Sequence, residues 1–231
     1  MTGKGFGKLS ILVPAYNEKH TLTALLEQLL RLPIDKEIII VDDGSSDGTA
    51  GIVRDRLQDT DCIKLFHIRN EGKGAAIRTA LKKATGQRVV IQDADLEYDP
   101  RDILKLLKAA EEGGYAVVYG SRFMKMGRRL SLFNRLANVI VTGWVNIIYG
   151  THLTDVETCY KMLNLCLAKD LNLREKRFGI DPELTTGVLR RGIKIYEVPV
   201  SYEPRTKKEG KKITWVDGLW ALWVVSRSRM F

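Results

Sequence analysis

The chain has 231 residues, of which 45% are hydrophobic and 28% are charged. This composition is that of an ordinary globular protein, and the length suits one large α/β domain or a domain with an appendage. The three cysteines are scattered and form no CxxC pattern, so they indicate neither a disulfide framework nor a thiolate zinc site. The net charge of +9 favours an anionic partner, but no RNP, helix-turn-helix or zinc-finger pattern accompanies it, and we expect no nucleic-acid partner.

Strands and helices alternate over the first half of the chain. An apolar run over residues 9–14 predicts a strand, and leucines at helical spacing predict a helix over residues 22–30. Similar patterns predict the strands 37–41, 63–68, 88–92 and 115–119 and the helices 49–57, 73–84 and 100–110. This alternation predicts a doubly wound, mostly parallel sheet with right-handed crossovers.

Three polar segments follow predicted strands, at residues 14–18, 42–47 and 93–97. Ligands of doubly wound sheets bind at the carboxyl ends of the strands. We therefore expect the three segments to converge on one crevice.

The segment Asp93-Ala94-Asp95, with Glu97 two residues further on, places several carboxylates at the end of a buried strand. Such carboxylates repel one another and resist burial unless a cation joins them. Their hard oxygen atoms suit Mg²⁺ or Mn²⁺, with a diphosphate supplying further ligands. An acidic turn that caps the next helix is the alternative reading.

Two basic residues are placed to meet a phosphate group. Lys73 lies in the glycine-containing segment 70–74 at a predicted helix start, where an anion is stabilised, although such a segment is often only a helix cap. Arg122 ends the fifth predicted strand, and its planar guanidinium can reach the diphosphate of a donor or the phosphate of an acceptor.

The second half contains two apolar segments, 130–149 and 213–229, which hold all four tryptophans of the chain. Neither reads as a membrane span, because polar residues interrupt the first and the second is too short. Tryptophan and an unusually wide apolar helix face favour interfacial attachment to a membrane. The alternative is that the two helices pack on each other or in a dimer interface.

The motifs together resemble one family. Pro14-Ala15-Tyr16-Asn17-Glu18, Val41-Asp42-Asp43-Gly44-Ser45-Ser46-Asp47-Gly48-Thr49 and Asp93-Ala94-Asp95 resemble the family 2 glycosyltransferases of the GT-A fold. The resemblance continues through 120–122, 155–161 and 198–205, and it is closest to dolichyl-phosphate mannose synthases and related polyprenyl-phosphate glycosyltransferases.

The resemblance implies a GT-A type, Rossmann-like α/β fold with C-terminal amphipathic interface helices. Residues 1–125 would form the nucleotide-sugar-binding half, residues 126–212 the acceptor-binding half of the same domain, and residues 213–231 a C-terminal amphipathic helix.

The resemblance also assigns roles to residues. Asp95 and Glu97 would bind Mg²⁺ or Mn²⁺. Asp155 would lie near the acceptor as a general base or a positioning group, with Arg122 as the second catalytic residue. The residues expected to bind the nucleotide sugar are Pro14, Ala15, Tyr16, Glu18, Val41, Asp43, Lys73, Asp93, Ala94, Arg205 and Lys211. A solvated charge run is the alternative reading of the basic segment that holds the last two.

The implied activity is inverting transfer of a hexose, with mannose and GDP-mannose favoured, to dolichyl or another polyprenyl phosphate. A UDP-hexose donor or a soluble glycan acceptor is the alternative. Because the first ten residues lack the apolar core of a secretory signal, we expect peripheral attachment at the cytoplasmic face of a membrane. The sequence leaves open whether a homodimer or a separate membrane subunit is involved.

Overall fold

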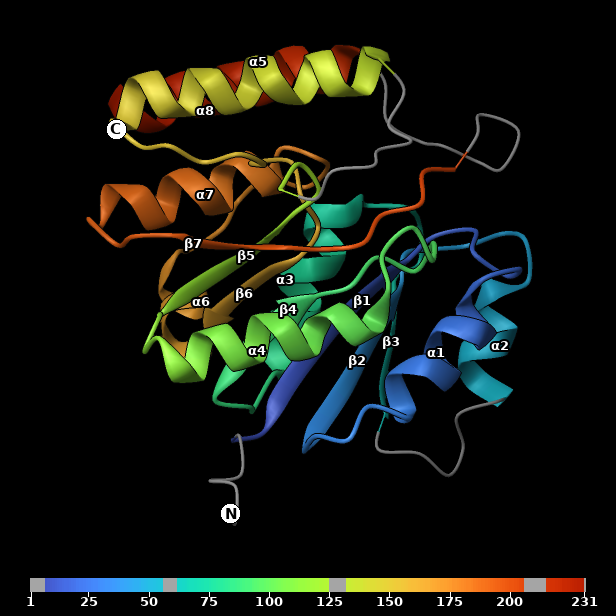
Figure 1. Ribbon diagram of the computed structural model, residues 1–231. Coiled ribbons are helices and arrows are strands. Elements are labelled where there is room, and N and C mark those ends of the chain that lie inside the picture. Colours follow the sequence, from blue (N-terminus) through green and yellow to red (C-terminus); the bar gives the residue numbers. More distant parts are fainter. Residues whose placement is uncertain (1–6, 56–61, 125–131, 206–214, 231) are drawn as a thin grey trace.

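The computed structural model describes residues 7–55, 62–124, 132–205 and 215–230 (Figure 1). In chain order its elements are β1 (Leu9–Ala15), α1 (Leu22–Leu30), β2 (Lys36–Asp42), α2 (Thr49–Asp55), β3 (Cys62–Phe66), α3 (Lys73–Lys83), β4 (Arg88–Ile91), the 3₁₀ turn η1 (Pro100–Asp102), α4 (Ile103–Glu112), β5 (Val117–Ser121), α5 (Leu132–Tyr149), β6 (Lys161–Asn164), α6 (Leu165–Asp170), α7 (Ile180–Arg190), β7 (Tyr196–Pro199) and α8 (Trp215–Met230).

The strands form one seven-stranded sheet in the order β3-β2-β1-β4-β6-β5-β7. All neighbouring pairs are parallel except those of β6, which runs antiparallel to β4 and to β5. The predicted doubly wound, mostly parallel α/β fold is therefore confirmed. Strand β6 was not predicted, because four residues are too few to show a period and the first of them is the charged Lys161.

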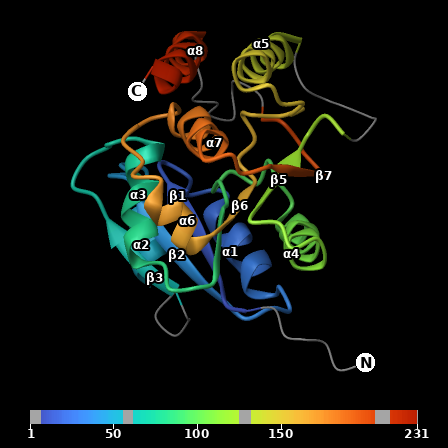
Figure 2. The same cartoon turned by 90° about the vertical axis from the view of Figure 1, so that its left-hand side faces the viewer.

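Helices cover both faces of the sheet (Figure 2). Helix α3 packs on β1, β2 and α6, whereas α4 packs on β5 and β7 across the sheet. The central strand β1 is consequently buried along most of its length, with Leu9, Ile11, Leu12 and Val13 at 1% exposure or less. Burial on both faces explains why this strand reads as a continuous apolar run.

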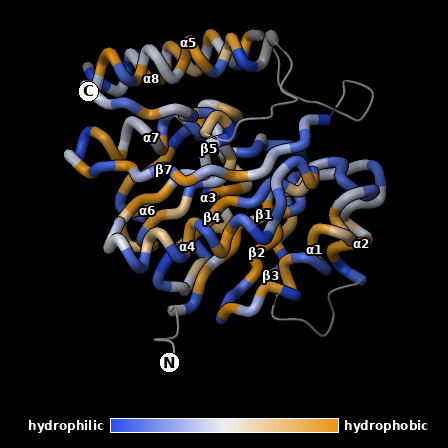
Figure 3. Tube along the Cα trace, in the orientation of Figure 1, coloured by the Kyte–Doolittle hydropathy of each residue, from blue (hydrophilic) through white to orange (hydrophobic). Residues whose placement is uncertain are grey.

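Helices α5 and α8 lie side by side over α7, beyond the carboxyl edge of the sheet (Figures 1 and 3). Val141 and Val145 of α5 and Ala221 and Val225 of α8 form a small second core. The helices thus pack on each other, which the sequence left open as an alternative. Both helices also expose large apolar side chains, namely Leu136, Val139, Ile140, Trp144 and Ile147 of α5 and Val216, Leu219, Trp220 and Trp223 of α8.

The two halves expected from the resemblance share the sheet, because β6 of the second half is hydrogen-bonded between β4 and β5 of the first. Both expected boundaries, 125/126 and 212/213, lie outside the described residues. The division itself stays a prediction.

A buried carboxylate joins β1, β2 and the turn before β4. Glu37 accepts hydrogen bonds from Ser10 Oγ (2.6 Å), Thr85 N (2.6 Å) and Thr85 Oγ1 (2.8 Å), and its carboxylate lies 2.8 Å from Lys8 Nζ. Burial opposes ionisation, but the hydrogen bonds from Lys8, Ser10 and Thr85 outweigh it and lower the pKa of Glu37 to about 2.

We expect Glu37→Gln to lower the free energy of unfolding at pH 7 by about 1–3 kcal/mol, because buried donors lose a charged acceptor. The ionised carboxylate stabilises the fold above its ordinary pKa of 4.5, and this contribution is lost as the pH falls from 4.5 towards 2. Urea unfolding at pH 7, 4 and 3 should therefore show a shrinking difference from the wild type. Glu27→Gln on the exposed surface of α1 is the control, and a pH-independent difference would contradict this account of Glu37.

Candidate active site

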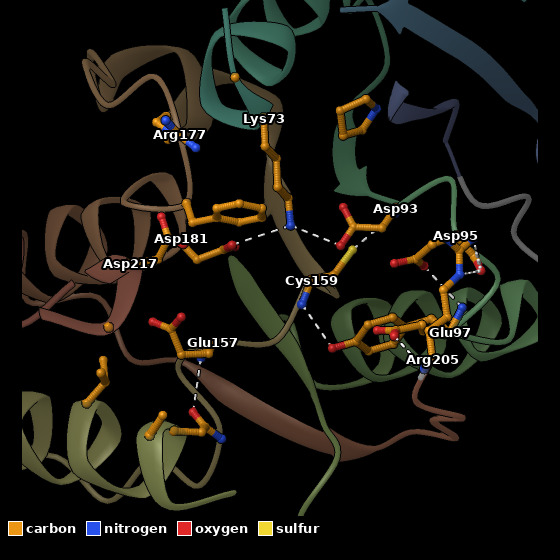
Figure 4. A pocket seen from close by; sticks show the side chains of 18 of the residues that line it. Lys73, Asp93, Asp95, Glu97, Glu157, Cys159, Arg177, Asp181, Arg205 and Asp217 are labelled. Atoms are coloured by element: carbon orange, nitrogen blue, oxygen red, sulfur yellow. Dashed lines mark hydrogen bonds and ion pairs between the residues drawn. The ribbon is translucent and has the colours of Figure 1, made fainter. Parts of the chain in front are cut away.

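A cavity of about 630 Å³ opens at the carboxyl edge of the sheet, beneath α5 and α8. Its lining comes from the loops after β1, β2, β4 and β5, from the start of α3 and from the segment that leads into α7 (Figure 4). The predicted convergence of the polar segments on one crevice is therefore what the structure shows.

Hydrogen bonds bring the loops after β1 and β2 together. Asn17 has a φ of 52°, a left-handed conformation that asparagine tolerates better than most residues. Its backbone N donates to Ser45 Oγ (2.9 Å), and its side-chain Oδ1 accepts from Ser46 N (2.9 Å). Glu18 N donates to Thr49 Oγ1 (2.8 Å). These contacts hold Pro14, Tyr16 and Glu18 along one wall of the cavity.

Asp43 organises the loop that precedes α3. Its carboxylate accepts from Glu71 N (2.9 Å) and Gly72 N (2.8 Å), and it lies 2.6 Å from His67 Nδ1. Gly72 has a φ of 101°, and a Cβ there would come within 2.4 Å of Lys176 O, so this position requires glycine. The loop thereby delivers Lys73 to the cavity at a fixed position.

Four charged residues alternate in sign at the cavity floor, where Lys73, Asp93 and Asp181 line the cavity and Lys161 is buried behind them. Lys73 Nζ lies 3.0 Å from Asp93 Oδ2 and 3.4 Å from Asp181 Oδ2 (Figure 4). Lys161 Nζ lies 2.8 Å from Asp181 Oδ1. Burial opposes the charge of Lys73, but Asp181 and Asp93 outweigh it and raise its pKa. Burial likewise opposes ionisation of Asp181, yet Lys161 and Lys73 lower its pKa.

Asp95 and Glu97 lie on a tight turn after β4. Between them Leu96 has a φ of 61°, a conformation that costs a non-glycine residue about 1–2 kcal/mol. Burial, with the charges of Asp93 and Glu97, raises the pKa of Asp95 to about 7. A divalent cation would relieve this repulsion, and carboxylate oxygens are suitable ligands for it. Within the described residues, no set of three or more His, Cys, Asp or Glu is arranged to hold a metal alone.

Arg205 closes one side of this carboxylate cluster. Its Nη2 donates to Glu18 Oε2 (2.8 Å) and to the Asp95 carbonyl (2.6 Å), and its backbone N donates to Glu97 Oε1 (2.7 Å). Tyr202 OH donates to Glu97 Oε2 (2.6 Å). The chain after β7 therefore folds back over the turn that holds Asp95.

Arg122 and Asp155 form a buried ion pair. Arg122 Nε lies 2.7 Å from Asp155 Oδ2, and Nη2 lies 2.8 Å from Oδ1, in a bidentate geometry. Asn138 of α5 donates to Asp155 Oδ1 as well (2.9 Å). Asp155 is fully buried and lies outside the cavity lining, whereas Arg122 is part of that lining. Asp155 therefore contacts Arg122 directly, and its role as a base or a positioning group stays a prediction.

The segment 174–177 connects α8 to α3. Trp220 Nε1 and Arg227 Nη2 of α8 donate to the Glu175 carboxylate at 2.8 and 3.0 Å. The Lys176 carbonyl accepts from Ala75 N of α3 at 3.0 Å. One short segment thus contacts both the outer helix layer and the helix that begins with Lys73.

The structure brings most of the predicted residues together. Those that line the cavity are Pro14, Ala15, Tyr16, Glu18, Asp43, Lys73, Asp93, Ala94, Asp95, Glu97, Arg122 and Arg205. Val41 is buried in β2 and, like Asp155, lies outside the lining. Lys211 lies outside the described residues.

Several lining residues were not assigned from the sequence. They are Tyr98, Glu157, Cys159, Arg177, Phe178, Asp181 and Tyr202. Asp181 precedes Pro182 at the start of α7, where an aspartate is easily taken for a helix cap. Lys161 is a charged residue with apolar neighbours in the sequence. This pattern could have indicated that Lys161 is buried next to a carboxylate such as Asp181.

The fold and this cavity define a GT-A protein. The crystal structure of glucosyl-3-phosphoglycerate synthase from Mycobacterium tuberculosis, in complex with Mn²⁺, uridine diphosphate and glucosyl-3-phosphoglycerate, superimposes with a TM-score of 0.70. The match covers 96% of this chain and 80% of that one, at 18% identity.

Residues 10–164 match the model of glycosyl transferase family 2, so the chain belongs to that family. Undecaprenyl-phosphate 4-deoxy-4-formamido-L-arabinose transferase of Aeromonas hydrophila subsp. hydrophila is 30% identical over 209 residues. That match covers 88% of this chain and 62% of the relative. The protein of that name from Proteus mirabilis is 30% identical over 216 residues, or 91% of this chain and 64% of its own length. The chain thus spans somewhat less than two thirds of these relatives.

We expect Asp155→Asn to leave the affinity for GDP or UDP within about threefold, because Asp155 does not line the cavity, and to lower thermal stability. Removing one charge of a buried ion pair lowers the free energy of unfolding by about 3–5 kcal/mol. Because asparagine has nearly the same shape as aspartate, the decrease should lie near the lower end of this range. Calorimetric titration and thermal unfolding measure the two effects, with Asp170→Asn at the exposed end of α6 as control. Abolished nucleotide binding in a folded variant would assign Asp155 to the donor site instead.

Proposed function

We propose that this protein is an inverting glycosyltransferase that moves a hexose from a nucleoside-diphosphate sugar to a polyprenyl phosphate, with Mg²⁺ or Mn²⁺ as cofactor. The observation that carries the proposal is the two-sided character of the cavity. Its floor holds carboxylates and buried cations, whereas its roof is apolar. Membership of glycosyl transferase family 2 and the similarity to undecaprenyl-phosphate transferases support it.

The apolar roof suits a lipid acceptor. Leu136, Ile140 and Val141 of α5 and Leu219 and Leu222 of α8 line the cavity from above. A shallow apolar groove lined by Ile140, Trp144, Leu222, Trp223 and Ser226 continues between the same helices. A prenyl chain lying along this groove would place its phosphate at the cavity and would bury its apolar surface against these side chains.

The loops after β1 and β2 suit the nucleotide. Pro14 and Tyr16 offer an apolar wall and an aromatic ring to the base, and Glu18 and Asp43 offer acceptors to base or ribose donors. Lys73 and Arg205, with Lys211 by resemblance, would meet the diphosphate. GDP-mannose is the donor we favour on resemblance, and a UDP-hexose is the alternative.

Asp95 and Glu97 are the residues that would hold the metal ion, with diphosphate oxygens completing its coordination. When bound, the ion neutralises charge on the departing diphosphate. In the transfer, an acceptor phosphate oxygen forms a bond to the anomeric carbon while the bond from that carbon to the diphosphate oxygen breaks, with inversion. The products are a polyprenyl-phosphate sugar and a nucleoside diphosphate. The attacking oxygen is already ionised at neutral pH, so the buried Asp155 need only hold Arg122 towards the phosphates.

We also propose peripheral attachment at the cytoplasmic face of a membrane. Large apolar side chains of both α5 and α8 are exposed, and the hydropathy colouring marks many hydrophobic residues along both helices (Figure 3). No helix among the described residues is long and apolar enough to cross a membrane. A net charge of +9 favours an anionic lipid surface.

Transfer of radiolabelled sugar from GDP-mannose, UDP-glucose and UDP-N-acetylglucosamine to a short polyprenyl phosphate tests the activity. We expect label in the organic phase with one donor, no label with EDTA, and a loss of at least about 100-fold in Asp95→Asn, which lacks a metal ligand. Glu112→Gln on exposed α4 is the control. Label that enters only a soluble acceptor would overturn the lipid assignment, and full activity of Asp95→Asn would overturn the metal assignment.

Flotation with anionic liposomes tests the membrane surface. We expect the wild type to float and Val139→Glu/Ile147→Glu to bind at least about tenfold more weakly, because each side chain contributes about 1.5–3 kcal/mol when buried in an apolar environment. Both residues are exposed on α5 and lie outside the cavity lining, and Ile147 is 75% exposed. Ile68→Glu, on the loop after β3, is the matched control. A wild type that stays at the bottom of the gradient would overturn the attachment.

A further inference from the structure

Glu157 is a carboxyl group that the proposed transfer, as described above, does not use. It lies on the segment between α5 and β6 and lines the cavity. Its side chain points towards Asp181 (Figure 4). Within the described part of the chain, Oε1 is buried and has no hydrogen-bond partner. Leaving a buried carboxyl oxygen unpaired is destabilising, so its retention in a cavity indicates a partner that arrives with a ligand.

The neighbours of Glu157 fix its position between the two parts of the cavity. On one side, Glu157 N donates to Asn138 Oδ1 of α5 (3.4 Å), and Val156 N donates to Thr142 Oγ1 of the same helix (3.1 Å). On the other side, Cys159 Sγ accepts from Asp93 N at the end of β4 (3.2 Å). The segment therefore crosses from the apolar roof to the carboxylate floor, with Glu157 between them.

We propose that Glu157 binds hydroxyl groups of the donor hexose and thereby contributes to sugar specificity. This inference rests on the proposed function, which places the diphosphate at the floor of the cavity and the lipid at its roof. The group between them is then the transferred sugar. A diphosphate, an ionised acceptor phosphate and a prenyl chain carry no hydrogen-bond donors for Oε1, whereas a hexose carries several hydroxyl groups.

The charges around Glu157 fit this role. Burial, with Asp181 and Asp155, raises its pKa to about 7 despite the opposing effect of Lys161 and Arg122. Near neutral pH such a carboxyl group is present in both forms, so it can accept hydrogen bonds from hydroxyl groups and donate to one. Among the nearby cations, Lys161 is bonded to Asp181 and Arg122 to Asp155, so neither forms an ion pair with Glu157 within the described residues.

The test compares the affinities for a nucleoside diphosphate and for its sugar nucleotide, by calorimetry with Mn²⁺. The pairs are GDP with GDP-mannose, UDP with UDP-glucose and UDP with UDP-N-acetylglucosamine, measured on the wild type, Glu157→Ala, Glu157→Gln and the control Glu112→Gln. We expect Glu157→Ala to bind the free diphosphate within about twofold and the sugar nucleotide at least about tenfold more weakly, as for a lost hydrogen bond to a charged group. The affinity of Glu157→Gln for the sugar nucleotide should lie between those of the wild type and Glu157→Ala.

Equal weakening of both ligands in Glu157→Ala, or no weakening of either, would overturn the inference, because a structural role does not distinguish the sugar from the nucleotide. A wild type that binds none of the five ligands would overturn the proposed function together with the inference, and this outcome is seen before any variant is made.

Deoxy analogues of the donor that the wild type prefers provide a second measurement. The wild type should bind the analogue that lacks the contacted hydroxyl about tenfold more weakly than the full donor. Glu157→Ala should bind both with about the same affinity, as expected when the hydroxyl and Glu157 are the two partners of one interaction. An equal loss with both proteins for every analogue would assign sugar recognition to other residues.

Discussion

The cavity floor depends on a row of buried charges of alternating sign, Asp93, Lys73, Asp181 and Lys161. They come from the loop after β4, from α3, α7 and β6, so four segments far apart in the sequence must be packed correctly before all of these charges are neutralised. A charge left alone in this position would be strongly destabilising. Lys73 is the member that a phosphate can reach, and it already shares its ammonium group between two carboxylates. An arriving diphosphate therefore competes with Asp93 and Asp181 for hydrogen bonds that are oriented in advance.

The fold and the donor half of the site could be predicted from the sequence because their determinants are local. Apolar runs and leucine periodicity mark the strands and helices, and the carboxyl ends of parallel strands meet at one edge whatever the details of packing. The segments 14–18, 42–47 and 93–97 consequently meet as expected. The hydrogen bonds of Asn17 to Ser45 and Ser46 show how two of these motifs depend on each other across 28 residues of sequence.

The remaining features depend on contacts that no local pattern contains. Asp155 was expected near the acceptor, yet it is fully buried and bonded to Arg122, which follows β5, and to Asn138 of α5. Asp181 pairs with both Lys161 and Lys73, from which it is separated by 20 and 108 residues. Arg205 was expected at the phosphates, but its contacts with Glu18 and the Asp95 carbonyl follow from the return of the chain after β7.

The segment that joins α8 to α3 links two ends of the molecule thermodynamically. Glu175 is bonded to Trp220 and Arg227 in the outer layer, and its neighbour Lys176 is bonded to Ala75, two residues after Lys73. Any ligand that shifts this segment changes the free energy of both ends at once. Thermodynamic linkage makes such an effect reciprocal. If binding of a partner to α8 changed the nucleotide affinity by some factor, bound nucleotide would change the affinity for that partner by the same factor.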